Sequence, residues 1–246
     1  MKRLLWLLMA TVLVAGLLLP GCSGGDTGKI RVATDATWAP FEYVDTATDA
    51  IVGFDIDLFN AIAEKAGLEV EWVNVEWDPL LAGVSQGTYD AAISSITIKE
   101  SRMAEMDFSD PYYIAGQIIV ARTESAIAGV EDLPGKKVGV QSGTTGDDEA
   151  SAIDGVDVTG YDEIGMAFAA LMNKQIDAVV CDTPVASGYV NKYDTLKTVG
   201  EVLTTEEYGI AMPKGSDELK AKINKALAEV KAENIIDQLV EKWLVG

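Results

Sequence analysis

The sequence predicts an α/β fold of two similar lobes, each built on a mainly parallel β-sheet flanked by helices. Strand and helix patterns alternate along the chain, and the order strand–helix–strand starts twice. Two segments that each follow a predicted helix also look alike, YDAAISS at 89–95 and IDAVVCD at 176–182. Because consecutive parallel strands need a crossover helix between them, this order favours a parallel sheet in each lobe.

The first lobe is predicted to contain three strands and two helices. A strand over 29–36 precedes a helix over 53–67, whose apolar residues recur on one face and whose last residue is glycine. Alternation of apolar and polar residues indicates a strand over 68–75. A shorter helix over 78–87 then leads into the strand over 89–95, which completes the βαβαβ order.

The second lobe begins with the same kind of pattern. A strand is predicted over 135–143, a helix over 165–175, and a strand over 176–182. The chain then ends in helices with apolar stripes, and the first of these has Ser216 or Asp217 as its N-cap.

Two extended segments, 112–122 and 206–215, are predicted to connect the lobes. Two crossings make the first lobe discontinuous, so that it contains residues 29–113 and 210–246, while residues 114–209 form the second lobe. Such a pair of connections lets two lobes rotate about a hinge.

Residues 1–22 have the pattern of an export signal peptide. Positive charge in MKR is followed by an apolar run, and LLPGC ends at Cys22. A cysteine at this place resembles the bacterial lipobox, which implies cleavage before Cys22 and a lipid on its thiol. The alternative is an uncleaved anchor helix. Residues 23–28 predict a flexible tether. Both alternatives place the domain outside the cytoplasm, in the periplasm or on the outer face of the cell membrane.

Composition excludes several kinds of chemistry. The chain has no histidine, which removes histidine triads, histidine bases and histidine metal ligands. After Cys22 the sequence contains one further cysteine, Cys181, so the folded part has no disulfide. Loss of Lys2 and Arg3 with the signal leaves 17 of 19 basic residues against 39 acidic ones, a formal charge of −22. We therefore expect no nucleic-acid partner, and we predict no catalytic residue, cofactor or metal.

Polar residues stand where the predicted strands of the first lobe end. In open α/β sheets, ligands bind beyond the carboxyl ends of the strands. The first strand ends at Asp35, and Trp38 and Phe41 follow it. In AAISSITIKESR, the strand over 89–95 ends in hydroxyl residues and a cation follows; the residues concerned are Ser94, Ser95, Thr97 and Arg102.

The second lobe offers complementary groups at the equivalent places. Its first strand runs into QSGTTGDD at 141–148, which contains Gln141, Thr144 and Thr145, and its later strand ends at Asp182. If the lobes face each other, these groups suit a zwitterion. An arginine fork pairs with a carboxylate, backbone N–H groups at a glycine-rich helix start add donors, and an aspartate accepts from an ammonium group.

Each residue also has a structural interpretation. Arg102 stands in a charged segment and suits a surface position, while Asp35 and Asp182 suit turns or helix caps. Trp77 alternates with valines and suits a core position as well as a pocket wall. Ser94 is small enough to serve close packing alone. The coincidence of these residues at equivalent strand ends favours a shared site.

Motifs along nearly the whole chain after residue 28 resemble one family. The chain looks like the polar amino-acid-binding members of the extracytoplasmic solute-binding proteins that serve ABC importers. The motifs that carry this resemblance are VATDATWAPFEY (32–43), VGFDIDLFNAIAEKAG (52–67), DAAISSITIKESRMAEMDFSDPYY (90–113), GKKVGVQSGTTGD (135–147), DAVVCDTP (177–184) and EYGIAMPKGSDEL (207–219). The resemblance implies a two-lobed periplasmic-binding-protein fold, an ABC permease with its ATPase as partners, and a monomer.

The resemblance also implies roles for individual residues. Arg102 corresponds to the arginine that grips the α-carboxylate of the ligand, with backbone amides from Ser95 and Thr145. Thr97 and Asp182 correspond to the residues that hold the α-ammonium. Asp35, Trp38 and Trp77 correspond to the residues that line the region around the side chain of the ligand. The complete predicted ligand-binding set is Asp35, Trp38, Phe41, Trp77, Ser94, Ser95, Thr97, Arg102, Gln141, Thr144, Thr145 and Asp182.

The expected ligand is arginine or another basic amino acid, with glutamine second. GQIIVAR together with QSGTTGD looks closer to arginine-binding relatives, and Gln141 stands where glutamine binders can carry a lysine. Two alternatives belong to other classes. One is an amino-acid-sensing subunit of a signalling receptor. The other is an enzyme like the cyclohexadienyl dehydratases of this fold, which would need a carboxylic acid such as Asp35 or Glu42.

Overall fold

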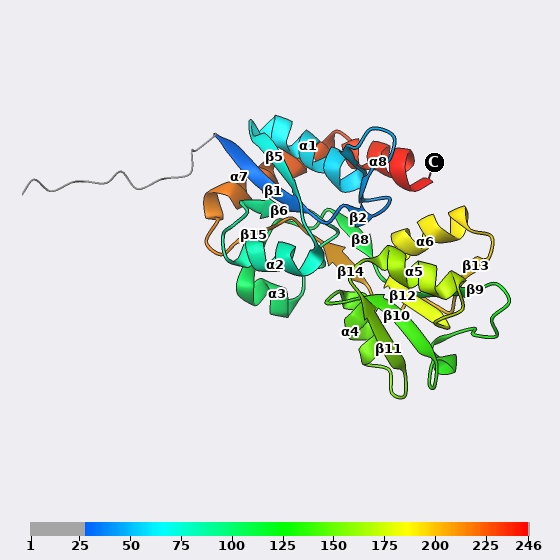
Figure 1. The fold of residues 1–246 in the computed structure, drawn as a ribbon. Helices are drawn as coiled ribbons and strands as arrows, with labels where there is room; N and C mark the ends of the chain where they lie inside the picture. Colours follow the sequence, from blue (N-terminus) through cyan, green and yellow to red (C-terminus); the bar gives the residue numbers. More distant parts are fainter. Residues whose placement is uncertain (1–27, 246) are drawn as a thin grey trace, which may run out of the picture.

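The computed structural model describes residues 28–245, which form two lobes (Figure 1). Each lobe contains a five-stranded sheet with helices on both faces. The expected signal peptide over 1–22, Cys22 and almost all of the expected tether over 23–28 lie outside the described residues. Within 28–245, no helix has the length and apolar character that a membrane span requires.

The sheet of the first lobe has the order β5-β1-β6-β15-β7. Strand β1 pairs in parallel with both β5 and β6, whereas β15 runs antiparallel between β6 and β7. The sheet is therefore mainly parallel, as predicted. Its strands are β1 (Lys29–Thr34), β5 (Glu69–Asn74), β6 (Ala91–Ala92), β15 (Ala211–Pro213) and β7 (Met106–Phe108).

Alternate side chains of the first sheet contact different helices. Val32 packs in the core that includes helix α1, whereas its neighbour Ala33 packs in the core that includes helix α2. Helix α1 begins directly after Gly53 and ends at Gly67, whose left-handed φ of 65° closes it. The helices of this lobe are α1 (Phe54–Ala66), α2 (Trp77–Ser85), α3 (Glu100–Glu105), α7 (Asp217–Ala232) and α8 (Ile235–Val240).

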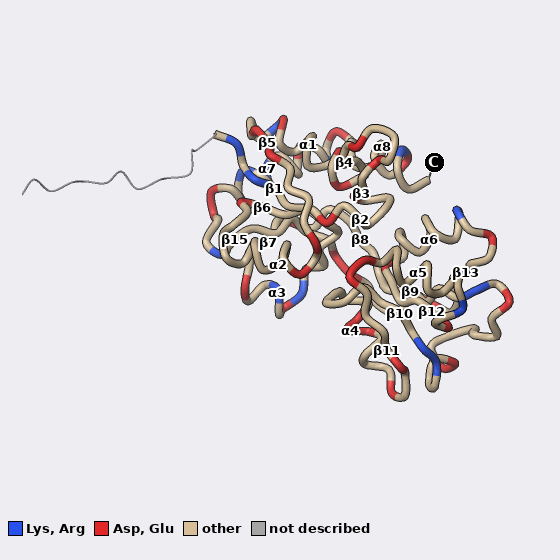
Figure 2. The backbone as a smooth tube through the Cα atoms, viewed as in Figure 1, with Lys and Arg blue, Asp and Glu red and all other residues tan. Residues whose placement is uncertain are grey.

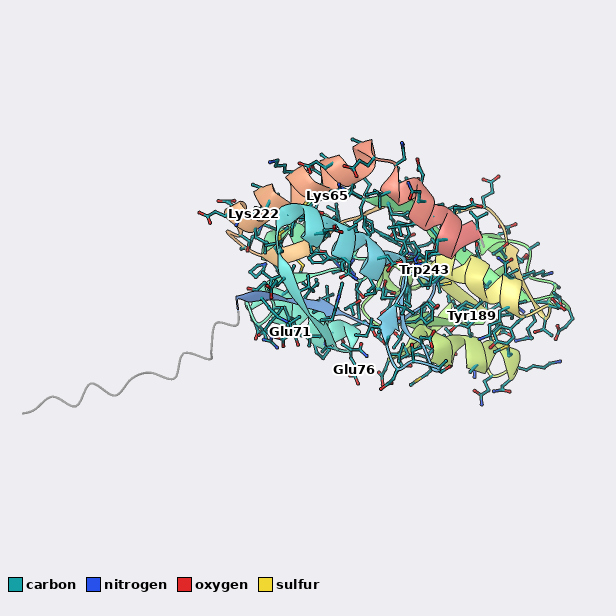
Figure 3. The ribbon with its side chains drawn as sticks, turned by 90° about the horizontal axis from the view of Figure 1, so that it is seen from above. Lys65, Glu71, Glu76, Tyr189, Lys222 and Trp243 are labelled. Carbon is teal, nitrogen blue, oxygen red and sulfur yellow. The ribbon has the colours of Figure 1, made fainter. Side chains whose placement is uncertain are left out.

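The C-terminal elements cover α1. Figure 3 shows α1 and α7 side by side above the first sheet, and Lys65 of α1 pairs with Glu233 just after α7. The last turn, Glu241–Val245, is fixed by Trp243, whose indole N–H donates to Asp57 Oδ2 at 2.9 Å. A small sheet of β2 (Thr37–Trp38), β3 (Glu42–Val44) and β4 (Ile51–Val52) lies in the segment between β1 and α1.

The sheet of the second lobe has the order β11-β10-β12-β9-β13, with β9 as its antiparallel member. Along β12, Val179 and Cys181 face the core shared with α5 and α6, whereas Ala178 and Val180 face the core shared with α4. The elements are β9 (Gln117–Arg122), β10 (Lys137–Gln141), α4 (Thr145–Ser151), β11 (Asp157–Tyr161), α5 (Ile164–Met172), β12 (Ala178–Asp182), α6 (Thr183–Lys192), β13 (Leu196–Val199) and a 3-10 turn, Val130–Asp132.

The two alike segments, 89–95 and 176–182, do occupy equivalent places. Strand β6 follows α2 and is third in its sheet, and β12 follows α5 and is third in its own. The strand in the first lobe is shorter than expected. It ends at Ala92, and Ser95 has a φ of 49°, so the chain turns at the hydroxyl residues, beyond the end of the strand.

Two short strands link the lobes. β8 (Tyr113–Ala115) and β14 (Glu206–Tyr208) pair antiparallel with each other and form a ribbon between the two large sheets (Figure 1). We keep the lobe boundaries at 113/114 and 209/210 as a proposal, since they fall on or beside this ribbon. Figure 2 shows that acidic residues are distributed over both lobes.

Candidate ligand-binding site

A pocket between the lobes gathers most of the predicted residues. It is lined by residues from both lobes and contains eleven of the twelve predicted positions. Asp182, the last residue of β12, faces it from the second lobe, opposite groups that follow β1 and β6 in the first. The lining residues are Asp35, Trp38, Glu42, Trp77, Ser94, Ser95, Thr97, Arg102, Gln141, Thr144, Thr145 and Asp182.

Phe41 is the predicted residue that does not line the pocket. Its ring is fully buried and lies 5.1 Å from Phe54, 5.1 Å from Tyr113 and 5.7 Å from Tyr208, centroid to centroid. Its place at the pocket is therefore corrected to a place in an aromatic core beside the hinge ribbon. The next residue, Glu42, reaches the pocket instead; Phe41 ends a turn in which its backbone N–H donates to Trp38 O at 2.9 Å, and Glu42 begins β3.

Arg102 is buried, although it comes from a charged helix. Only 6% of the residue is exposed, and its guanidinium donates to the carbonyl oxygens of Thr97 at 3.1 Å and Gly143 at 3.4 Å. The guanidinium carbon also lies 5.0 Å from the ring centre of Trp77. Burial lowers the pKa of Arg102, and no carboxylate lies within ion-pair distance of it among residues 28–245. A buried cation with donors left over is suited to an anionic ligand group.

Asp182 is the acidic group of the second lobe at the pocket. Its carboxylate accepts hydrogen bonds from Gln117 Nε2 and from the Tyr208 hydroxyl, one at each oxygen. Burial raises the pKa of Asp182 to about 6, and the neighbouring Glu206 adds to this, while Tyr208, Gln117 and Arg102 act in the opposite direction. Each carboxylate oxygen keeps acceptor capacity for a cationic ligand group.

Asp35 and Gln141 form a second polar group of the pocket, again across the lobes. Gln141 Nε2 donates to Asp35 Oδ2 at 3.0 Å, and Thr37 Oγ1 donates to Asp35 Oδ1 at 2.9 Å. Burial raises the pKa of Asp35 against these hydrogen bonds. In the described part of the chain, Gln141 Oε1 and the indole N–H of Trp38 have no hydrogen-bond partner, although both are buried. Such groups are free to bind a ligand side chain.

The two serines make different contacts from those expected. Ser94 Oγ accepts from the backbone N–H of Asp35 at 3.0 Å and donates to Glu42 Oε1 at 3.0 Å. The backbone N–H of Ser95 donates to Asp55 Oδ2 at 2.8 Å, so it is not available for a ligand carboxylate as the resemblance implied. Both serines therefore build the floor of the pocket.

Two backbone amides of the pocket lining are candidate donors in place of that of Ser95: that of Thr145, which the resemblance already implied, and that of Thr97, which it did not imply. The N–H groups of Thr97 and of Thr145, which begins α4, have no hydrogen-bond partner within residues 28–245. Thr144 caps α4 by accepting from the backbone N–H of Asp147 at 3.3 Å. Together with Arg102, these free amides form a donor-rich end of the pocket, whereas Asp182 provides an acceptor.

The chain matches one family of known proteins over almost all of its described residues. The model of the bacterial extracellular solute-binding proteins, family 3, matches residues 30–246. The chain belongs to this family. The two-lobed α/β fold described above is shared with solved amino-acid-binding proteins.

Relatives of this solute-binding protein match over almost their full length. The arginine-binding extracellular protein ArtP of Bacillus subtilis (strain 168) is 34% identical, with 100% of this chain and 99% of the relative covered. The arginine-, lysine-, histidine-binding protein ArtJ of Geobacillus stearothermophilus is 38% identical with a TM-score of 0.84, covering 89% of this chain and 96% of its own. An ancestral arginine-binding protein solved with arginine is 44% identical with a TM-score of 0.83, covering 88% and 98%. An ancestral arginine-binding protein, 44% identical with a TM-score of 0.83, has also been solved with glutamine.

Four buried residues near the pocket of this solute-binding protein were absent from the predicted set. Glu42 lines the pocket, Gln117 and Tyr208 hold Asp182, and Glu206 binds two threonines of the pocket. Three of them belong to the hinge ribbon or to the strand that follows it. The motif EEYGIAMPKG at 206–215 contains two of them, Glu206 and Tyr208. Polar residues in an otherwise apolar segment indicate that such groups are buried with hydrogen-bond partners.

Proposed function

We propose that this solute-binding protein captures a polar L-amino acid between its lobes and delivers it to the permease of an ABC importer. One observation carries this proposal. A buried guanidinium without an ionic partner in the described chain, Arg102, and a buried carboxylate, Asp182, line one pocket from different lobes. An α-carboxylate and an α-ammonium satisfy both ends at once, and the cost of leaving either charge buried and unpaired favours closure around a zwitterion.

We propose arginine or another basic amino acid as the ligand, with glutamine second. The far part of the pocket has acceptors in Asp35 and in Gln141 Oε1, and the flat ring of Trp38 stands beside them. A guanidinium offers five N–H donors to such acceptors and stacks on aromatic rings, whereas an amide offers two donors and no charge. The arginine-binding names of the relatives support the same order.

Calorimetry of the purified protein against the common amino acids tests the proposal. Saturable binding is expected, strongest for arginine, with Kd in the micromolar range or below. A thermal-shift screen provides a second readout, since a ligand that binds only the folded state raises Tm. Absence of saturable binding to any amino acid would contradict the function. Preference for an anionic or purely apolar amino acid would contradict the ligand class.

We also propose that the mature protein is a monomer held at the membrane by a lipid on Cys22, with the permease and its ATPase as partners. The signal pattern over 1–22 and the lipobox-like LLPGC support this arrangement. Expression of the full chain and of Cys22→Ser in a bacterial host, followed by membrane fractionation and detergent partitioning, tests the anchor. The serine variant is expected in the soluble fraction. Equal membrane association of both forms would contradict lipidation.

A further inference from the structure

Glu206 of β14 contacts both lobes through a single carboxylate oxygen. Its Oε2 accepts from Thr97 Oγ1 of the first lobe at 2.7 Å and from Thr145 Oγ1 of the second lobe at 2.8 Å. Its Oε1 accepts from Thr204 Oγ1 at 2.7 Å. The residue is 7% exposed and does not line the pocket itself.

No basic side chain lies within ion-pair distance of Glu206 in the part of the chain that the structure describes. A buried carboxylate without a cationic partner costs stability, and three hydroxyl donors offset that cost only in part. Its position is better explained by its effect on the hydroxyl groups that it binds, because the carboxylate fixes the direction in which their hydrogens point.

A threonine hydroxyl has one hydrogen to donate and two lone pairs that accept. Thr145 already uses both kinds of capacity, because Oγ1 donates to Glu206 and accepts from Gln117 Nε2 at 3.0 Å. Thr97 donates to Glu206 and lines the pocket, and no hydrogen bond to its Oγ1 lone pairs is made within residues 28–245. With its hydrogen committed to Glu206, the Thr97 hydroxyl is left as an acceptor only.

We propose that Glu206 is a positioning residue for the α-ammonium of the ligand, acting through Thr97. This inference rests on the proposed function. By holding the hydroxyl hydrogen of Thr97, Glu206 directs a lone pair of Thr97 toward the ammonium beside Asp182. By accepting from Thr145 as well, the same oxygen makes this arrangement complete only when the two lobes are closed. Ammonium recognition and closure therefore depend on one buried carboxylate.

The test compares an amino acid with its analogue lacking the α-amino group. The probes are L-arginine and 5-guanidinopentanoic acid, or L-glutamine and glutaramic acid if the wild type prefers glutamine. Calorimetry or competition is performed on the wild type, Glu206→Ala and Glu206→Gln. Loss of a hydrogen-bond group that serves a charged partner corresponds to roughly tenfold or more in affinity. Glu206→Ala is expected to weaken amino-acid binding by that factor and to change analogue binding by less than about threefold.

Glu206→Gln retains an oxygen that accepts from Thr97, and it is expected to recover most of the affinity lost in Glu206→Ala. A Gln variant as weak as the Ala variant would overturn the orientation of the hydroxyl. Glu207→Ala is the matched control, because Glu207 is the next residue of β14 and is exposed. Equal losses for amino acid and analogue in Glu206→Ala would show a merely structural role and would overturn the inference.

A second comparison covers the case in which Glu206→Ala fails to fold. Thr97→Val removes the hydroxyl that Glu206 orients, and it is expected to lower the ratio of amino-acid to analogue affinity by roughly tenfold or more, whereas Glu206→Gln is expected to keep that ratio close to the wild-type value. A Thr97→Val variant that keeps the wild-type ratio would overturn the inference. Failure of the wild type to bind any amino acid would instead defeat the proposed function, so the two failures are distinguishable.

Discussion

Arg102 and Asp182 line the same pocket from different lobes, yet they form no ion pair with each other. Each is nevertheless close enough to change the pKa of the other: against the larger effect of burial, Asp182 raises the pKa of Arg102, and Arg102 lowers that of Asp182. Two buried opposite charges that stay separated leave room for a molecule carrying both signs. This separation is the structural basis of the proposed zwitterion binding. Removal of the positive charge is therefore expected to lower the affinity for ligand without lowering the stability of the free protein.

Replacing Arg102 is expected to abolish binding without destabilising the ligand-free protein. Arg102→Met keeps the length and apolar contacts of the side chain and removes a buried charge that has no ionic partner among the described residues. We expect more than a hundredfold loss of affinity for every amino acid, with Tm of the free protein unchanged or raised. Calorimetry and thermal unfolding measure the two effects.

Arg102→Lys is the matched control for charge without the guanidinium fork. It is expected to recover part of the affinity, because an ammonium pairs with a carboxylate as a point charge. A Met variant whose Tm falls markedly would argue that Arg102 serves mainly to hold Thr97 and Gly143 in place.

Binding is expected to weaken as the pH falls through about 6. The carboxyl of Asp182 must be ionised to hold an ammonium, and burial raises its pKa to about 6. Below that pH a proton competes with the ligand, so the apparent Kd rises by up to about tenfold for each further pH unit. Calorimetry between pH 4.5 and 8 checks this slope. In Asp182→Asn, affinity is expected to be low at every pH, and a slope that persists there would assign it to another group.

Asp35 is expected to set the ranking of ligands. Asp35→Asn keeps the size of the side chain and removes the charge that faces the far part of the pocket. We expect affinity for arginine to fall at least tenfold and affinity for glutamine to change by less than about threefold. A competition assay with both ligands measures the ratio. Equal losses for the two ligands would remove the selectivity role from Asp35.

The buried pair of Glu42 and Asp55 is expected to make the free protein less stable as the pH rises. Burial raises the pKa of Asp55 to about 7 and, together with Asp55, raises the pKa of Glu42 well above its ordinary value. The unfolded chain loses these protons near pH 4, whereas the folded chain keeps them longer, so stability falls as the pH rises from about 4 through about 7. Thermal unfolding between pH 4 and 9 follows this trend.

Glu42→Gln keeps a neutral group at this position and is expected to make Tm less dependent on pH. Glu71→Gln is the surface control, because Glu71 stands exposed on the edge strand β5 (Figure 3). An unchanged dependence in Glu42→Gln would show that other carboxyls account for the effect.

The sequence was sufficient to predict the two similar sheets and the pocket at their strand ends. Periodicity is local, and the rule for strand ends then brings Asp35 and Asp182 together without knowledge of packing, whereas Arg102 lies in α3, beyond the end of β6. It was not sufficient for Phe41, because nothing in APFEY tells which of two neighbouring residues turns inward.

The hydrogen-bond partners of individual groups could not be predicted from the sequence either. The Ser95 amide is used by Asp55, forty residues earlier in the chain, and Glu206 meets Thr97 and Thr145 only after both lobes and the ribbon have come together. Such pairings depend on tertiary structure, and one sequence carries no pattern for them.

The pairing of β8 with β14 has a mechanical consequence. Two independent linkers would allow the lobes to twist, slide and separate, whereas two crossings tied by their own backbone hydrogen bonds bend as one unit. We therefore expect the relative movement of the lobes to reduce to nearly one rotational degree of freedom. In a protein built in this way, the presence or absence of a small molecule selects one of two overall shapes. A partner in the membrane can recognise that shape without contacting the small molecule.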